Sequence, residues 1–95
     1  MKVIFSKLAR REFEDAIHFY ELEYAGLGEK FKQEIENMVL RIAKNPRAWS
    51  IESGEVRKGL LHRFPYKLLY SIEQDHIFII AVVAPSTSQT RLLDR

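Results

Sequence analysis

The chain contains no cysteine among its 95 residues. A disulfide framework and a thiolate metal site are therefore excluded, and a reducing cytoplasm is the simplest compartment. His18, His62 and His76 lie in different predicted elements without the spacing of zinc ligands, so we expect no metal and no cofactor. A glycine-rich phosphate loop and a Gly-x-Ser-x-Gly motif are missing as well, which leaves the common enzyme motifs unrepresented.

Long apolar runs are also missing. No stretch approaches the length that spans a bilayer, and the first residues reach charge too early for a secretory signal, so we expect a soluble cytoplasmic protein without membrane contact. Hydrophobic residues make up 46% of the chain and charged residues 29%, a composition typical of a folded globular protein. This length suits one domain with its own core, and we predict a single domain over residues 1–95.

The first half of the sequence predicts a strand and two antiparallel helices. Residues 3–5 form a short apolar run, and Ser6 is a good N-cap for the helix that follows. Gly26 and Gly28 interrupt the helical pattern, which resumes at about Glu29 and stops at residues 45–46. Apolar residues recur at helical spacing in both stretches: Phe13, Ala16, Ile17, Tyr20 and Tyr24, then Phe31, Ile35, Met38 and Ile42. These stripes fit a core, although the pattern also suits a partner helix lying in a groove.

Residues 47–55 are predicted to be a connecting loop. Trp49 is expected to anchor this loop on the domain, and the alternative is that it forms part of a binding surface. His18, next to the apolar stripe of the first helix, is assigned no role.

The second half predicts an antiparallel β-meander. Apolar and polar residues alternate on both sides of residues 64–65, which places Leu68 and Tyr70 on a core face and Lys67 and Leu69 on the other face. Residues 73–75 predict a hairpin turn. Residues 76–84 are almost continuously apolar and predict a central strand covered on most sides. The predicted class is therefore α+β, ending in an irregular tail over residues 84–95 that is rich in Pro, Ser and Thr.

Positive charge is concentrated in the meander. Residues 56–72 contain Arg57, Lys58, Arg63 and Lys67 and no acidic residue, in a chain whose formal net charge is only +2. Alternation places Arg57 and Arg63 on the same side. Such a group can bind phosphates or an acidic partner, and the plain alternative is ordinary solvated side chains. If Arg57, Arg63 and Lys67 converged beside His62 on one RNA phosphate, they would be candidates for catalysis.

The order of elements resembles that of the RelE/ParE toxin superfamily. The resemblance covers residues 1 to about 83, and it rests on Leu27-Gly28 with Phe31, on Pro46, and on Arg63-Phe64-Pro65-Tyr66-Lys67 followed by Tyr70. It implies a β-α-α-β-β-β fold and the toxin role of a bacterial type II toxin-antitoxin or plasmid stabilisation module. It also implies growth inhibition and neutralisation by a cognate antitoxin from a neighbouring gene.

Two activities occur within this superfamily. RelE-like members cut messenger RNA on the ribosome, and ParE-like members poison DNA gyrase. Lys67 matches a basic position of the RelE-like nucleases, but residues 84–90 lack the basic and aromatic residues that such relatives carry after the last strand. We therefore predict a ParE-like toxin, without enzymatic activity, that binds its target through Arg57, Lys58, Arg63 and Lys67. The alternatives are a ribosome-dependent mRNA endoribonuclease and a disarmed remnant that binds only its antitoxin.

Overall fold

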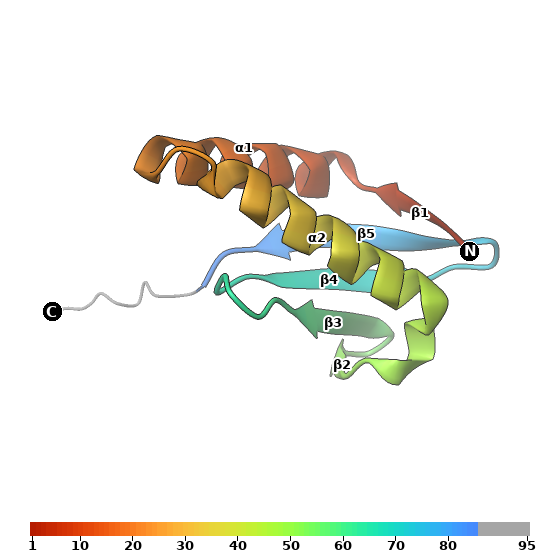
Figure 1. Cartoon of the computed structure of the whole chain (residues 1–95). Coiled ribbons are helices and arrows are strands. Elements are labelled where there is room, and N and C mark those ends of the chain that lie inside the picture. Colours follow the sequence, from red (N-terminus) through yellow and green to blue (C-terminus); the bar gives the residue numbers. More distant parts are fainter. Residues whose placement is uncertain (86–95) are drawn as a thin grey trace, which may run out of the picture.

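The computed structural model of the chain describes residues 1–85. Five strands form one sheet, and two long helices cover one of its faces (Figure 1). The predicted α+β fold is confirmed, and residues 86–95 of the predicted tail lie outside the described residues. The elements are β1 (Lys2–Phe5), α1 (Lys7–Glu23), α2 (Leu27–Lys44), the 3₁₀ helix η1 (Pro46–Ala48), β2 (Ile51–Ser53), β3 (Val56–Leu60), β4 (Lys67–Ile72) and β5 (His76–Val83).

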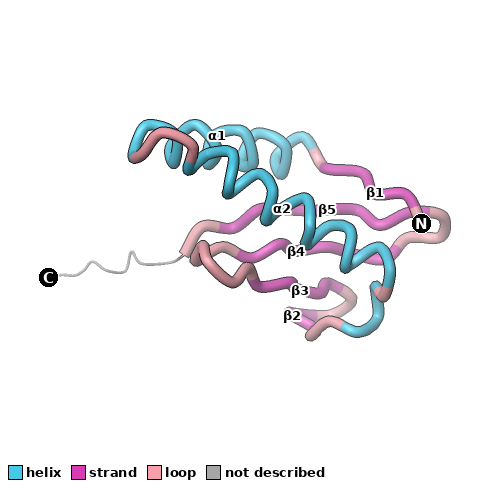
Figure 2. Tube along the Cα trace, in the orientation of Figure 1, coloured by secondary structure: helices cyan, strands magenta, loops and turns pink. Residues whose placement is uncertain are grey.

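The sheet has the strand order β1-β5-β4-β3-β2. The neighbours from β5 to β2 are antiparallel, as the predicted meander requires. In contrast, β1 lies parallel to β5, with Lys2 opposite His76 and Phe5 opposite Ile79 (Figure 2). The sheet is therefore mixed, and its first and last strands lie side by side.

Ser6 connects the start of α1 to the sheet. Its Oγ accepts a hydrogen bond from the Ala9 N–H at 2.9 Å, which confirms the predicted N-cap. The same hydroxyl donates to the Ile80 carbonyl at 2.8 Å. A single side chain thus begins the helix and fixes its position over β5.

The start of α2 depends on a carboxylate from α1. The Glu21 carboxylate accepts hydrogen bonds at 2.9 and 3.0 Å from the backbone N–H groups of Gly26 and Gly28. These two N–H groups have no partner inside the helix. Gly28 also allows close helix contact, because a Cβ there would lie 2.6 Å from the Ile17 carbonyl oxygen. The second helix consequently begins at Leu27, slightly before the predicted Glu29, and ends at Lys44 as predicted.

Replacement of Glu21 by glutamine is expected to lower the free energy of unfolding by about 1 kcal/mol, because the amide keeps one acceptor oxygen and loses the charge. Urea unfolding measures this loss. Glu23→Gln is the matched control, since Glu23 is exposed and bonds to neither glycine. Equal losses in the two variants would contradict the capping role.

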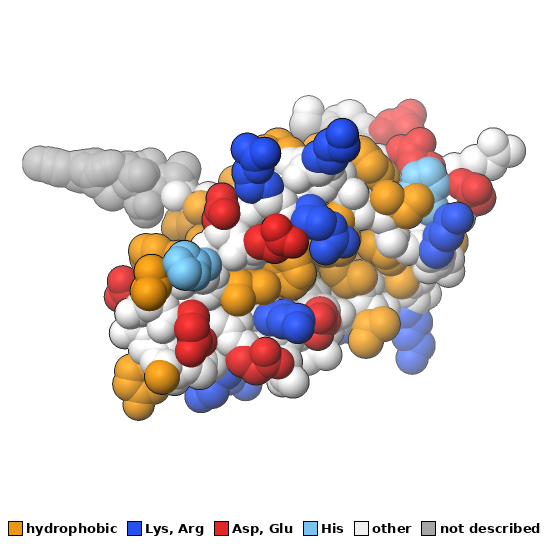
Figure 3. Space-filling model, turned by 90° about the horizontal axis from the view of Figure 1, so that it is seen from above, with side chains coloured by type: hydrophobic (Ala, Val, Ile, Leu, Met, Phe, Trp, Pro, Cys, Tyr) orange, Lys and Arg blue, Asp and Glu red, His pale blue; other side chains and the backbone are white. Residues whose placement is uncertain are grey.

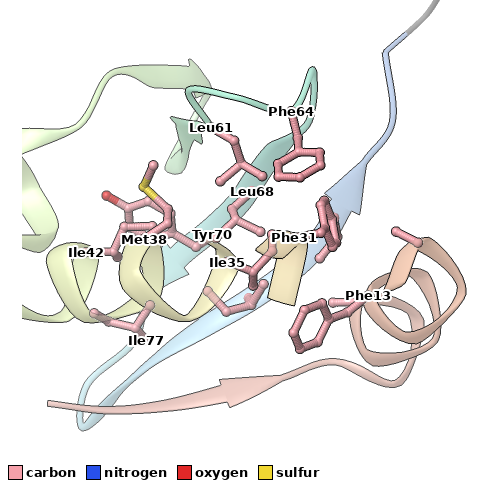
Figure 4. Packing of buried hydrophobic residues seen from close by; sticks show 14 residues of the cluster. Phe13, Phe31, Ile35, Met38, Ile42, Leu61, Phe64, Leu68, Tyr70 and Ile77 are labelled. Atoms are coloured by element: carbon pink, nitrogen blue, oxygen red, sulfur yellow. The ribbon is translucent and has the colours of Figure 1, made fainter. Parts of the chain in front are cut away.

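The hydrophobic core lies between the helices and the sheet (Figure 4). Leu68 and Tyr70 are fully buried, which confirms the predicted core face of β4. The Phe31 ring, also fully buried, lies within 5.3 Å of the rings of Tyr20, Phe64 and Tyr66, measured between centroids. An aromatic cluster therefore joins both helices to the loop between β3 and β4.

Tyrosine burial predicts a loss of stability at alkaline pH. Burial raises the pKa of Tyr20, Tyr66 and Tyr70 above the ordinary value of about 10. Their stabilising contribution is fully present below that value and is lost as the pH rises through the folded-state pKa values. Urea unfolding between about pH 7 and 11 should show this loss.

The variant Tyr70→Phe tests how much Tyr70 contributes to the loss of stability at alkaline pH. The Tyr70 hydroxyl donates to the Pro46 carbonyl at 2.6 Å, so the variant should lose about 1 kcal/mol at neutral pH. It should then lose less than the unmodified chain between neutral and alkaline pH. Identical pH slopes for the two proteins would contradict a contribution from Tyr70.

One sequence prediction requires correction. Residues 47–55 are not simply a loop, because they contain η1 and the short edge strand β2. The prediction that residues 76–84 form a central strand covered on most sides is confirmed: β5 lies between β1 and β4, the helices cover one face of the sheet (Figure 1), and no residue of β5 is exposed. The predicted anchor is confirmed: Trp49 packs against the core, and the Arg41 guanidinium lies 5.0 Å from its ring centroid.

Candidate interaction surface

The face of the sheet opposite the helices carries no other element of the described chain (Figure 1). Side chains directly opposite each other on paired strands share a face, so the register defines what this open face presents. Its rows are Leu60, Lys67 and Val83, then Lys58, Leu69 and Ala81, then Ser71 and Phe78. We call these residues the open face. It has an apolar centre, with Lys58 and Lys67 on its β2 side.

Glu52 of β2 lies between these two lysines. Its carboxylate oxygens lie 3.2 Å from Lys67 Nζ and 3.6 Å from Lys58 Nζ. The hydrogen bond from Lys67 and the charge of both lysines lower the pKa of Glu52. Because two ammonium groups share one carboxylate, the three side chains together keep one net positive charge that is available to an anionic partner.

Arg57 has a different position. It pairs across the sheet with the buried Tyr70 and therefore lies on the helix side. Its Nη1 donates to the carbonyl of Trp49 at 2.6 Å and to that of Arg47 at 3.3 Å. These bonds hold the segment between α2 and β2 against the sheet, so the guanidinium has a structural role.

Arg63 lies outside the strands, because β3 ends at Leu60, earlier than the sequence pattern indicates. The Glu34 carboxylate of α2 accepts from the N–H groups of His62 and Arg63 at 2.6 and 3.0 Å. Arg63 is exposed and lines an open groove along α2. Seen from the helix side, Figure 3 shows basic, acidic and hydrophobic side chains intermixed over this part of the surface.

The structure therefore divides the four predicted site residues. It brings Lys58 and Lys67 together on the open face, whereas Arg57 and Arg63 lie on the helix side in separate environments. Sequence reasoning missed Glu52, because its contact with both lysines depends on the pairing of β2 with β3. Within residues 1–85, no group of three or more His, Asp or Glu side chains is placed to hold a metal ion.

The described part of the chain contains no helix long and apolar enough to cross a membrane. A comparison with curated proteins found no match.

Comparisons with protein families and solved structures agree with this fold. The structure of a chromosomal ParDE TA system from P. aeruginosa matches with a TM-score of 0.75 and 18% sequence identity, over 90% of this chain and 96% of that chain. Residues 3–86 match the family described as the ParE toxin of type II toxin-antitoxin system, parDE. The chain that folds into this half-covered sheet therefore belongs to the ParE toxin family of type II toxin-antitoxin systems.

Proposed function

We propose that this chain arrests bacterial growth in the cytoplasm by binding DNA gyrase, and that a cognate antitoxin neutralises it. Membership of the ParE toxin family supports the toxin role. We infer that the open face is the binding surface, because an uncovered apolar surface lies there beside a pair of lysines. Gyrase is proposed as the target because ParE-like members of the superfamily poison that enzyme.

The separation of the basic side chains favours binding over RNA cleavage. A general acid or base has to come within hydrogen-bond distance of the proton it transfers, and a phosphodiester site needs several such groups around one phosphate. Arg57 instead donates to two backbone carbonyls, and Lys67 contacts Glu52. The open face also offers Leu69 and Phe78, which suit contact with an apolar protein surface.

Growth after induced expression tests the toxin role. Expression of this chain alone is expected to stop growth of a bacterial host, and expression of the neighbouring gene should restore it. The purified chain should then inhibit supercoiling by gyrase. Normal growth at a confirmed level of folded protein would contradict the proposed function. Cleavage of ribosome-bound message without any effect on gyrase would contradict the proposed target.

Charge reversal on the open face tests the binding surface. The double variant Lys58→Glu/Lys67→Glu is expected to weaken gyrase inhibition by about tenfold or more, because like charges then surround Glu52 and repel an acidic partner. Lys7→Glu/Lys32→Glu is the matched control, with the same change of charge at two exposed helical positions. Both variants should stay folded, since exposed ion pairs contribute little to stability. Equal inhibition by the two variants would exclude the open face as the target surface.

A further inference from the structure

An open pocket lies at one end of the open face, where β3 and β5 end and β4 begins. Its volume is about 420 Å³, and one row of the open face, Leu60, Lys67 and Val83, forms part of its wall. Figure 1 shows the loop between β3 and β4 beside the chain that follows β5, and these two segments complete the wall with Leu61, Pro65, Tyr66, Ala84 and Pro85. We call these eight residues the end pocket.

The wall of the end pocket is mainly apolar. Lys67 is its only charged member. The side chain of Leu60 is 58% exposed, although a leucine gains free energy when it leaves water. The volume lies near the lower end of the range in which proteins hold small ligands, so one large side chain of a partner fits. The pocket therefore offers apolar surface that a partner can cover.

Tyr66 holds one side of the end pocket in a fixed position. Its ring centroid lies 5.0 Å from that of Phe31 and 6.0 Å from that of Tyr20, and a hydrogen bond joins the hydroxyl groups of the two tyrosines. The Leu61 N–H donates to the Tyr66 carbonyl at 3.1 Å, which closes the loop between β3 and β4. A wall that is ordered before binding lowers the entropy cost of binding.

The charge beside the end pocket indicates the chemistry of its partner. Among the described residues, no carboxylate lines the pocket. Lys67 shares Glu52 with Lys58, so one carboxylate of a partner would neutralise the remaining positive charge. A nucleic acid is bound mainly by cations around its phosphates, and an apolar pocket with one lysine does not suit it. The features of the pocket favour a protein segment with both an apolar and an acidic side chain.

We propose that the end pocket holds an aromatic side chain of gyrase, and that an acidic residue close to it in the gyrase sequence pairs with Lys67. This inference rests on the proposed function, since gyrase is its target, and it adds the place and the chemistry of the contact. Aromatic side chains in apolar pockets are common among the strongest contacts of protein interfaces.

The first experiment measures the dissociation constant of the full-length chain and purified gyrase. Leu60→Gln is expected to raise it by about tenfold or more, because the complex would bury an amide against an apolar ring. Leu40→Gln is the matched control, at a position of α2 that is 67% exposed, and it should bind within about threefold of the unmodified chain. Urea unfolding should show that both variants keep their stability within about 0.5 kcal/mol.

Filling the pocket tests the same contact without removing an apolar group. Ala84 is exposed and lines the pocket, so the indole of Ala84→Trp should occupy it and raise the dissociation constant by about tenfold or more. Ala25→Trp is the matched control in the exposed turn between the helices. Equal affinities within each matched pair would overturn the inference. Failure of the unmodified chain to bind gyrase would contradict the proposed function itself.

Photo-crosslinking tests the chemistry of the partner. With p-benzoylphenylalanine in place of Leu60, irradiation of the complex with gyrase and DNA should join the chain to a gyrase peptide that contains an aromatic residue close to an aspartate or glutamate. The same group in place of Leu40 should give no such product. A crosslink to DNA, or to a gyrase peptide without acidic residues, would overturn the inference.

Two other occupants of the end pocket give distinct results. If residues 86–95 filled it, truncation after Pro85 would shift the methyl resonances of Leu60 and Leu61 in the isolated chain. If a second copy filled it, the isolated chain would be a dimer in light scattering, and Leu60→Gln would dissociate it. Either result would overturn the assignment to gyrase, whereas unshifted resonances and a monomer are expected.

Discussion

Replacement of Phe31 by alanine is expected to lower the free energy of unfolding by about 3–5 kcal/mol. The ring of Phe31 is fully buried and contacts aromatic rings from α1 and from the loop between β3 and β4. Removing it leaves a cavity where the two helices meet the sheet, because those elements cannot all move inward to fill it. Urea unfolding followed by circular dichroism measures the loss.

Phe19→Ala is the matched control for this change. It removes the same side chain from α1, where 53% of its surface is exposed, so the expected loss stays within about 0.5 kcal/mol. A domain of this size has a free energy of unfolding of about 5–10 kcal/mol. Low concentrations of urea should therefore unfold most of the Phe31→Ala variant. Similar losses in the two variants would show that the aromatic cluster does not dominate the core.

Replacement of Arg57 by methionine is expected to cost about 1.5–3 kcal/mol of stability. Methionine keeps an apolar stem of similar length, so the change removes mainly the guanidinium and its bonds to the carbonyls of Trp49 and Arg47. The loss should appear in urea unfolding. Lys58→Met, at the next position, removes one exposed ion pair and should cost within about 1 kcal/mol.

The same pair of variants separates structural roles from binding roles. At a temperature where both are folded, Arg57→Met should inhibit gyrase within about threefold of the unmodified chain, because Arg57 is on the helix side. Lys58→Met should inhibit more weakly. If Arg57→Met lost inhibition with an unchanged unfolding free energy, Arg57 would have to contact the target, as the sequence alone suggested.

Local signals in the sequence predict most of this fold. Ser6 marks the first helix, residues 45–46 end the second, and alternation along residues 66–72 separates the core face from the open face. These features depend on neighbours within a few positions, so their periodicity is visible in one sequence. The two helices and the meander are confirmed for that reason.

Contacts between distant segments account for what the sequence did not predict. The three residues of β2 are too few for a periodic pattern, and their pairing with β3 is what brings Glu52 to Lys58 and Lys67. Alternation placed Arg57 on one side of its strand, but only the register opposite Tyr70 identifies that side as the one facing the helices. The predicted cationic site therefore divides into two faces.

The parallel pairing of β1 with β5 affects the order in which the sheet forms during synthesis of the chain. β1 leaves the ribosome long before β5. Val3 and Phe5 can therefore pair only after Ile77 and Ile79 have been synthesised. Such distant pairing delays folding and leaves early segments uncovered. All three rows of the open face also end on β5, at Phe78, Ala81 and Val83. A fragment that ends before β5 therefore lacks both the strand that pairs with β1 and the strand that completes the open face.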